Sequence, residues 1–349
     1  MKVLLAVSGG IDSMYMLHRA PELFPGASFA VAHCNFCLRG EESDGDEAFV
    51  AAQCGTLGVE CFVKRFDTLG YASAHGVSVE MAARELRYDW FSELCAEHGF
   101  DALATAHNAN DNAETMILNL LRGTGTKGLR GIPGGADWSG SAFGEPSSHH
   151  TFGAVPPLLP RVAILPEGTT RTNGQTSLIR PLLGVTREEI RAWMEDKGFA
   201  WREDKTNAES EVKRNKIRNR VFPVFAEINP SFVKTLGEDM ARIRQTDDIA
   251  EDYYREAAAR IAKRAPEASG DAILEISVKG LLELKHWRYV LWRALEDYGF
   301  SAETFAKLCE LLDRYRTEPV GTVTLSGKTF QSPGFLIKAR RKSLLIINR

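Results

Sequence analysis

The first half of the chain alternates short apolar runs with amphipathic stretches. Residues 2–7 (KVLLAV) are an almost continuous apolar run, which predicts a strand buried on both faces. Residues 78–98 repeat large apolar side chains every three or four positions, which predicts a long amphipathic helix. The further predicted strands are residues 29–33, 60–66, 102–106 and 178–183, and the further predicted helices are residues 12–20, 41–57 and 110–121. Strands that alternate with helices predict an α/β fold with a parallel, Rossmann-like sheet.

The pattern changes in the second half of the chain. Residues 134–176 are rich in Gly, Ser, Pro and Thr, which predicts a long surface loop with one short hairpin around residues 160–165. After about residue 213 the predicted helices are residues 231–264, 278–298 and 302–316, and only the end of the chain, residues 321–348, alternates like strands. We therefore expect a first domain over residues 1–215, with a loop insertion at 134–176. A mainly helical domain over residues 216–349 is expected to end in a β-hairpin-like segment.

A glycine-rich turn follows the first predicted strand and leads into a helix. Glycines let backbone N–H groups approach a ligand closely, and the helix N-terminus adds partial positive charge. Two serine hydroxyls add further donors, so the turn is a candidate cradle for phosphate. A plain strand-to-helix turn is the alternative, but it does not account for an aspartate beside these hydroxyls, where a metal-bound phosphate would lie. The residues of the turn are Ser8, Gly9, Gly10, Ile11, Asp12 and Ser13.

A second polar run, residues 106–115, lies at the end of the fourth predicted strand. Ligand sites in open α/β sheets form at the carboxyl ends of strands, so this run and the glycine-rich turn are expected at the same edge. Asp111 and Glu114 are three residues apart, share one helix face and could both reach a Mg²⁺ ion, with His107 beside them. The alternative is an N-capped helix whose acidic residues favour its positive end.

The glycine-rich turn resembles the SGGxDS loop of the N-type ATP pyrophosphatases. Five further runs occur in the order found in the tRNA(Ile)-lysidine synthetases, a family within that group. These runs are residues 33–44, 121–133, 179–183, 201–207 and 214–218. The resemblance covers residues 1–230 apart from 134–176. It implies an adenine nucleotide alpha hydrolase-like domain, followed by a helical part and a small β element.

The resemblance also implies a reaction. In this family ATP adenylates the C2 oxygen of the wobble cytidine in the CAU anticodon of tRNA(Ile), and pyrophosphate is released. The ε-amine of free L-lysine then displaces AMP and forms lysidine, which changes decoding from AUG to AUA. ATP and Mg²⁺ are therefore the expected cofactors, and free L-lysine and this tRNA the expected partners. A homodimer is consistent with the family.

The resemblance assigns roles to the two motifs. Residues 8–13 are expected to hold the β- and γ-phosphates, because negative charge accumulates on the pyrophosphate leaving group. The expected metal ligands are Asp12, Asp111 and Glu114, and the expected catalytic residues are His107, Asp111 and Asp12. Lysine attacks only as a free amine, so a carboxylate or an imidazole must accept a proton. The sequence leaves open whether His107 or Asp111 is that base.

Basic residues outside these motifs are candidates for contacts with the substrate or the tRNA. Arginine offers a planar fork of donors for phosphate or carboxylate, although a structural ion pair or a solvated position explains any one of them equally well. Residues 213–220 include five basic side chains and no acidic one, which favours RNA binding over an ordinary solvated helix face. A second basic run covers residues 338–342. The candidates are Arg39, Arg122, Arg180, Lys213, Arg214, Asn215, Lys216 and Arg218.

The net charge of −3 argues at first against a nucleic-acid partner. Its distribution changes that picture, because residues 1–130 carry 10 basic and 17 acidic side chains, whereas residues 131–349 carry 33 and 29. The acidic part contains both nucleotide motifs, and the basic part contains both basic runs. The expected RNA surface therefore lies in the second part.

Composition narrows the class of protein further. The 6 cysteines are too few for a disulfide scaffold, and no apolar run is as long as a membrane-spanning helix. The first predicted strand does not resemble a signal peptide. A cytoplasmic protein is therefore expected. Cys34 and Cys37 have the spacing of half a metal site, and we favour ordinary strand and loop cysteines.

Two alternatives are kept for the function. One is another N-type ATP pyrophosphatase, such as a tRNA thiolation enzyme, and the other is a catalytically inactive RNA-binding relative.

Overall fold

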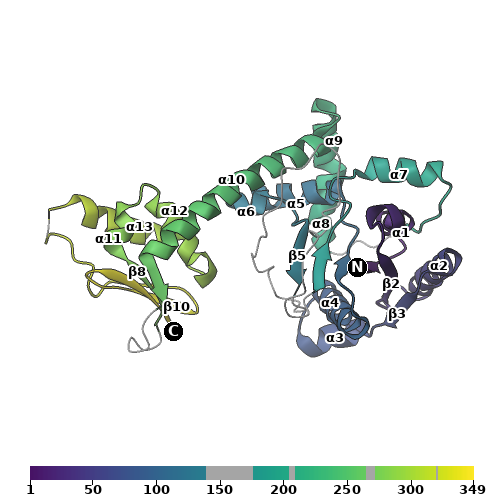
Figure 1. The fold of residues 1–349 in the computed structure, drawn as a ribbon, viewed down its shortest axis with the longest axis horizontal. Helices are drawn as coiled ribbons and strands as arrows, with labels where there is room; N and C mark the ends of the chain where they lie inside the picture. The colour runs from purple at the N-terminus through teal and green to yellow at the C-terminus, as the bar shows by residue number, and fades with distance from the viewer. Residues whose placement is uncertain (139–175, 204–208, 265–271, 320) are drawn as a thin grey trace. The chain divides into compact units, whose positions relative to one another are not determined.

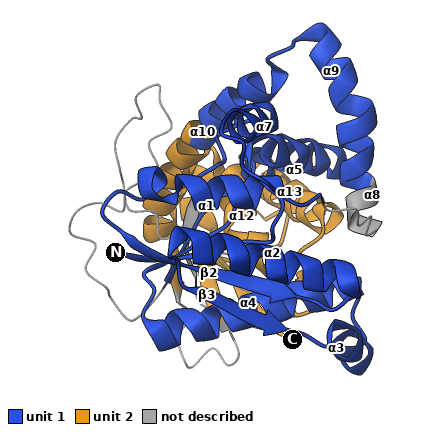
Figure 2. Cartoon of the chain, turned by 90° about the vertical axis from the view of Figure 1, so that its right-hand side faces the viewer, with its two compact units in different colours: residues 1–244 blue, residues 245–349 orange. Residues whose placement is uncertain are grey.

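The computed structural model describes residues 1–138, 176–203, 209–264, 272–319 and 321–349 (Figure 1). The chain divides into two compact units, residues 1–244 and residues 245–349 (Figure 2). The boundary between them falls inside helix α10 (Phe232–Ile261). The predicted hairpin at residues 160–165 lies outside the described residues. Within the described ranges, no helix combines the length and the apolar character that a membrane span needs.

A six-stranded sheet forms the middle of the first unit, in the order β3-β2-β1-β4-β6-β5. Five strands are parallel, which confirms the predicted α/β architecture. Strand β5 is antiparallel to β6 and corrects the prediction of a loop from residue 134 onward, because its hydrogen-bonding partner is distant in the sequence. The strands are β1 (Lys2–Ala6), β2 (Ser28–Asn35), β3 (Cys61–Arg65), β4 (Ala102–Ala104), β5 (Gly135–Trp138) and β6 (Thr176–Ile179).

Helices pack on both faces of this sheet. Leu4 and Leu5 of β1 point to opposite faces, and both are fully buried. Leu5 belongs to the apolar core that α1 and α7 complete, whereas Leu4 belongs to the core that α4 completes. This burial on two sides explains why β1 reads as a continuous apolar run. The helices of this part are α1 (Ile11–Leu23), α2 (Glu41–Leu57), α3 (Thr68–His75), α4 (Val79–His98), α5 (Ala109–Arg122), α6 (Thr126–Leu129) and α7 (Arg187–Asp196).

A further group of helices packs against α5. The elements are α8 (Glu209–Lys216), the π-helical turn η1 (Ile217–Val221) and α9 (Phe222–Ile228). Ile217 and Phe222 are buried in a small apolar cluster with Ile117 of α5. This contact brings the neighbouring Arg218 onto α5, and wide turns of this kind are frequent at functional sites.

An antiparallel sheet and several helices form the second unit, with an apolar core between them. The strand order is β7-β8-β11-β10-β9, which confirms the predicted small β element at the end of the chain. The strands are β7 (Ala262–Arg264), β8 (Ala272–Ser277), β9 (Thr329–Gln331), β10 (Phe335–Ala339) and β11 (Ser343–Asn348). The helices are α11 (Val278–Glu283), α12 (Trp287–Leu295), the 3₁₀ turn η3 (Glu296–Tyr298) and α13 (Ala302–Thr317).

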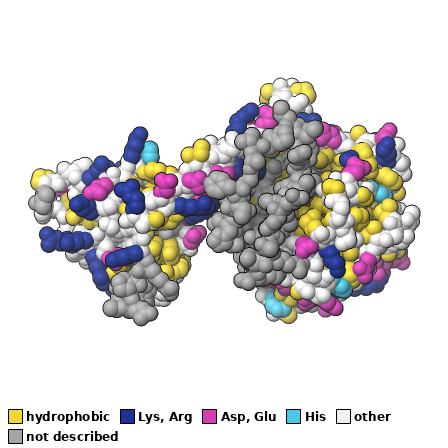
Figure 3. Space-filling model, viewed as in Figure 1, with side chains coloured by type: hydrophobic (Ala, Val, Ile, Leu, Met, Phe, Trp, Pro, Cys, Tyr) yellow, Lys and Arg dark blue, Asp and Glu magenta, His cyan; other side chains and the backbone are white. Residues whose placement is uncertain are grey.

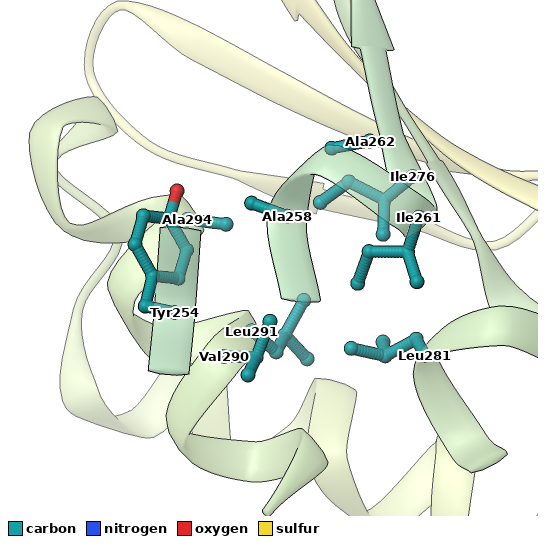
Figure 4. A pocket seen from close by; sticks show the side chains of 9 residues that line it. All are labelled: Tyr254, Ala258, Ile261, Ala262, Ile276, Leu281, Val290, Leu291 and Ala294. Atoms are coloured by element: carbon teal, nitrogen blue, oxygen red, sulfur yellow. The ribbon is translucent and has the colours of Figure 1, made fainter. Parts of the chain in front are cut away.

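Two features of this unit correct the sequence-based prediction. Strands β7 and β8 were not expected, because β7 continues directly from helix α10 and β8 pairs on its other side with β11, far along the chain. The single helix expected over residues 278–298 is interrupted at Leu284, whose extended backbone ends α11. Figure 4 shows a small cavity in this core, lined by aliphatic side chains and Tyr254. With no charged side chain in its lining, the cavity is a gap in apolar packing.

Candidate active site

The two predicted nucleotide motifs meet at the carboxyl ends of β1 and β4. These strands are neighbours in the sheet, with Leu4 opposite Leu103. Asn108, the N-cap of α5, donates a hydrogen bond from Nδ2 to Oδ1 of Asp12 at 2.9 Å. Asp111 closes a capping box by accepting from the backbone N–H of Asn108 at 3.2 Å. The structure thus joins Asp12 and Asp111 into one polar cluster.

Backbone N–H groups converge in the glycine-rich turn. Those of Ser8 and Gly9 both donate to Oγ of Ser13, at 3.1 and 3.2 Å. Oγ of Ser13 donates in turn to the carbonyl of Gly10 at 2.9 Å, which fixes the turn on the first residues of α1. Ile11 anchors the turn by packing against the apolar core. The two amides thus converge on one oxygen atom, which is Oγ of Ser13 in this structure, and a phosphate oxygen would have to take the place of that hydroxyl to accept from both.

The turn depends on a glycine at position 9. Gly9 has a φ of 93°, which L side chains rarely adopt, and an added Cβ would lie 3.4 Å from Cγ2 of Val50. Gly10 has a φ of −71°, which any residue adopts. We expect Gly9→Ala to lower the free energy of unfolding by about 1–2 kcal/mol, and Gly10→Ala to lower it less. Urea titrations of both variants measure the difference, and equal losses would contradict the strain assigned to Gly9.

Arg187 lies between the two carboxylates of the cluster. Its Nη2 is 3.8 Å from Oδ2 of Asp12 and 3.5 Å from Oδ1 of Asp111. Its backbone N–H donates to Oδ1 of Asn110 at 2.9 Å, which fixes the start of α7 beside α5. Burial raises the pKa of Asp12, the Asp111 carboxylate adds to the rise, and Arg187 opposes it. Arg187 was not predicted from the sequence, although a cation in the first turn of a helix is unusual because the helix dipole disfavours positive charge there.

Glu114 forms a buried ion pair with Arg218. The side chain of Glu114 is 1% exposed, and its two oxygens accept from Nε and Nη2 of Arg218 at 2.8 and 3.1 Å. Burial raises the pKa of Glu114, and Arg218 opposes that rise. Nη2 of Arg218 also lies 3.7 Å from Oδ1 of Asp111. Arg218, which was predicted to contact tRNA, therefore forms an ion pair with Glu114, which was predicted to bind the metal.

The carboxylates fit a magnesium ion only in part. Among the residues that the structure describes, no three His, Cys, Asp or Glu side chains form a metal-binding group. Asp12 and Asp111 nevertheless both face the guanidinium group of Arg187. The space between the two carboxylates therefore favours a positive charge. Enzymes that use nucleotides usually hold Mg²⁺ with one or two carboxylates plus substrate phosphates. Asp12 and Asp111 fit that pattern, whereas both oxygens of Glu114 are occupied by Arg218.

His107 is half-buried next to the cluster, where both the nearby arginines and Asp111 act on it. Its Nδ1 shares a hydrogen bond with Oγ1 of Thr105 at 3.0 Å. Burial, together with the positive charges of Arg180 and Arg214, lowers the pKa of His107 to about 4. The imidazole is therefore neutral at physiological pH and is a weak proton acceptor there.

The protonation state of His107 is directly measurable. We expect its ring nitrogens to keep the chemical shifts of the neutral form from about pH 8 down to about pH 5.5, because a lowered pKa moves the titration below that window. Nitrogen NMR of the labelled protein records these shifts, and the His107→Gln variant identifies the signal by its loss. An inflection near about 6.5, the usual value for histidine, would contradict the assigned environment.

The other predicted basic residues lie at different distances from the cluster. Arg180 donates from Nη1 to the carbonyl of Pro133 at 2.7 Å, and its positive charge helps to lower the pKa of His107. Lys213, Arg214 and Lys216 are exposed on α8, with Asn215 half-buried between them. Arg122 is exposed at the last residue of α5, at the opposite end of that helix from Asp111. The structure thus brings Arg180 and Arg214 to the site and leaves Arg122 away from it.

Arg39 is tied to the glycine-rich turn by an ion-pair network. Its Nη2 lies 2.9 Å from Oδ2 of Asp46, and the guanidinium of Arg202 contacts the same carboxylate. The backbone N–H of Arg202 donates to the carbonyl of Gly9 at 2.9 Å. Arg39 and Arg202 therefore hold α2 and the segment after α7 on the turn. Arg202 belongs to a run of the family resemblance but was not singled out as a site residue.

Of the CxxC pair, Cys34 lies in β2 and Cys37 lies just after that strand. Burial raises the pKa of the Cys34 thiol to about 12, so Cys34 stays protonated and is a poor metal ligand. Cys37 is exposed and has a φ of 53°.

Comparisons with known proteins identify two domains in this chain. The sequence model of a PP-loop domain matches residues 1–225, and that of a TilS substrate binding domain matches residues 269–349. The tRNA(Ile)-lysidine synthase of Chlorobaculum tepidum is 37% identical over 331 residues, covering 91% of this chain and 86% of that protein. The tRNA(Ile)-lysidine synthase of Porphyromonas gingivalis is 36% identical over 311 residues, covering 89% of this chain and 58% of that protein.

Among solved structures, the U34-tRNA thiolase NcsA from Methanococcus maripaludis is similar, with 17% identity and a TM-score of 0.47. The matched region covers 70% of this chain and 71% of that one. The PP-loop match covers more than half of this chain, and the match to the Chlorobaculum tepidum protein covers nearly all of it. This chain therefore belongs to the tRNA(Ile)-lysidine synthase family and carries its PP-loop ATP-binding domain at the N-terminus.

Proposed function

We propose that this chain ligates lysine to C2 of the wobble cytidine in the CAU anticodon of tRNA(Ile), at the expense of ATP. The reaction would pass through an adenylated cytidine, form lysidine and change decoding from AUG to AUA. The observation that supports this most is the junction of the glycine-rich turn with Asp12 and Asp111, in a chain of this family. A site with phosphate donors beside carboxylates suits an adenylation that releases pyrophosphate.

In the proposed first step, the C2 oxygen of the cytidine attacks the α-phosphate of ATP, and the bond to pyrophosphate breaks. We assign stabilisation of the negative charge on the leaving group to the N–H groups of Ser8 and Gly9 and the hydroxyl of Ser13, which would exchange their present hydrogen bonds with one another for bonds to phosphate oxygens. Arg187 adds a positive charge beside the same turn. A Mg²⁺ ion held by Asp12 and Asp111 would supply further positive charge to the phosphate oxygens.

In the proposed second step, the ε-nitrogen of lysine attacks C2, and AMP leaves with the oxygen that it activated. The incoming ammonium must first lose a proton. We assign its binding and deprotonation to Asp111, because its carboxylate lies in the cluster and is 22% exposed. Neutral His107 is then a hydrogen-bonding partner of the substrate, since burial and the charges of Arg180 and Arg214 disfavour a positive charge on its ring.

The proposed tRNA surface includes α8 and the second unit. Lys213, Arg214 and Lys216 present exposed charges on α8, next to the site. We propose that residues 216–349 act as the tRNA-binding domain, and the match to a TilS substrate binding domain supports this. Lys and Arg side chains are spread over the second unit in the view of Figure 3, and the basic residues of 338–342 are exposed. All the proposed reactants are water-soluble, so we place the reaction in the cytoplasm.

A single assay tests this function. The protein is incubated with ATP, Mg²⁺, radiolabelled lysine and tRNA(Ile) that carries a CAU anticodon. We expect label in the tRNA and release of pyrophosphate that requires the tRNA. Sulfur incorporation from an added donor, without lysine transfer, would instead indicate a thiolation enzyme. Binding of tRNA without any turnover of ATP would indicate an inactive relative.

A further inference from the structure

The proposed reaction assigns no role to the loop that follows α5, although this loop belongs to a run of the family resemblance. Its last part, the 130–134 segment, is bound by two helices of the first unit. Nη2 of Arg244, in α10, donates to the carbonyl of Arg130 at 2.9 Å. The backbone N–H of Ile132 donates to Oδ1 of Asn112, in α5, at 2.6 Å. The segment is therefore anchored to the helix whose first turn lies in the polar cluster.

The 130–134 segment packs without spare room at its glycine. Gly131 has a φ of 72°, and an added Cβ would lie 2.2 Å from Oδ1 of Asn112 and 2.3 Å from Sδ of Met240. These two neighbours are 6% and 1% exposed, so both belong to the interior of the unit. A buried amide oxygen is costly without a hydrogen bond, which keeps Oδ1 on the N–H of Ile132. Asn112 and Met240 therefore fix the position of the segment.

The same segment binds Arg180, which follows β6. The backbone N–H of Arg180 donates to the carbonyl of Gly134 at 3.0 Å, and its Nη1 donates to the carbonyl of Pro133 at 2.7 Å. Its Nε has no hydrogen-bonding partner among the described residues. The bond to Pro133 therefore sets the direction of the guanidinium group.

Strand pairing brings Arg180 to His107. The carbonyl of Ile179 accepts from the backbone N–H of Thr105 at 3.0 Å, and Oγ1 of Thr105 shares a hydrogen bond with Nδ1 of His107 at 3.0 Å. Arg180 is the residue after Ile179, and its charge disfavours a proton on His107. The direction of this guanidinium group thus affects a side chain of the active site.

We propose that Asn112 is a positioning residue of the active site, which places the guanidinium of Arg180 through the backbone of the 130–134 segment. Oδ1 of Asn112 fixes the N–H of Ile132, and the carbonyl that binds Arg180 belongs to the next residue, Pro133. The proline ring restricts rotation of the backbone between these two groups, so a shift at one of them is passed to the other. The inference rests on the proposed function only for its effect on activity, because the orientation of Arg180 can be measured without the reaction.

The test compares Asn112→Ala with wild type and with the matched control Asn119→Ala. Asn119 is also in α5 and donates from Nδ2 to the carbonyl of Gly128 at 2.9 Å, so its loss removes a bond to an earlier part of the same loop. A second variant, Pro133→Gly, frees the backbone at an exposed position and keeps the acceptor of Asn112. Each substitution is also made in an Arg180→Gln background, and urea titration shows which proteins are folded.

Nitrogen NMR of His107 and the kinetics of lysine transfer give the two readouts. We expect His107 to titrate at a higher pH in Asn112→Ala than in wild type, because the charge of Arg180 is less well placed. We expect kcat to fall about tenfold, with the KM for ATP as in wild type. Pro133→Gly should shift the titration in the same direction, and Asn119→Ala should change neither readout. None of these substitutions should add to the shift that Arg180→Gln causes alone.

An unchanged titration of His107 in folded Asn112→Ala would overturn the inference, and if that variant does not fold, an unchanged titration in Pro133→Gly would do so. A shift of full size in the Arg180→Gln background would also overturn it, because Asn112 would then act without Arg180. If His107 titrates as expected but wild type transfers no lysine, the proposed function falls and the positioning role stands.

Discussion

The Asp12→Asn variant is expected to release pyrophosphate about 10³-fold more slowly than wild type, with tRNA binding nearly unchanged. Asparagine has the shape of aspartate, and its Oδ1 can still accept the hydrogen bond from Asn108. The substitution therefore removes the charge and preserves the contact. Burial raises the pKa of Asp12, so the folded protein disfavours this charge, and its removal should not destabilise the fold. A loss of activity would then report on phosphate or metal binding.

Asp101→Asn is the matched control for this prediction. Asp101 lies just before β4, at the edge of the sheet opposite the cluster, and accepts from the backbone N–H of Lys2 at 2.7 Å. Its loss should leave pyrophosphate release near the wild-type rate. Stopped assays with labelled ATP give the rates, and anisotropy gives the tRNA affinity. An active Asp12→Asn variant, or one that has lost tRNA binding, would contradict the role proposed for this residue.

The Arg218→Leu variant is expected to lower the free energy of unfolding by about 3 kcal/mol, because it leaves Glu114 buried without a partner. The carboxylate is 1% exposed and has two hydrogen bonds from Arg218 in the native protein. The double variant Glu114→Gln/Arg218→Leu removes the stranded charge and should recover part of the loss. Urea titration of the three proteins measures both effects.

The loss in Arg218→Leu should grow as the pH rises. The pKa of Glu114 is already raised in the folded protein by burial, and removal of Arg218 takes away the main opposing effect. A carboxylate whose folded pKa exceeds its unfolded pKa favours folding while it is protonated, and that advantage is lost as pH rises through the folded value. The variant should therefore be closer to wild type at about pH 5 than at about pH 8. A loss that is independent of pH would point to packing instead of the stranded charge.

The nucleotide motifs could be predicted because they are local in the sequence. The buried run of β1, the glycine-rich turn and the start of α5 each occupy a few consecutive residues, and parallel strands bring their carboxyl ends to one edge. Asp12 and Asp111 were expected together on that ground, and Asn108 joins them.

The pairings between distant segments could not be predicted in this way. Arg218 and Glu114 are 104 residues apart, and only the packing of η1 on α5 brings them together. Arg187 was missed because its role depends on α7 starting beside α5. Strand β8 was missed because one of its two partners, β11, is distant in the sequence, and β7 was missed because it continues directly from α10. A local pattern carries no information on such partners, so the ion pairs of the site emerge only from the fold.

The most direct test of the proposed function is the identity of the modified nucleoside. tRNA(Ile) with a CAU anticodon is treated with the protein, ATP, Mg²⁺ and lysine, then digested to nucleosides and analysed by mass spectrometry. We expect the wobble cytidine to be replaced by a nucleoside whose mass equals cytidine plus lysine minus one water, and we expect no such product with Asp12→Asn. An unmodified wobble cytidine, or one that carries sulfur in place of oxygen, would contradict the proposal.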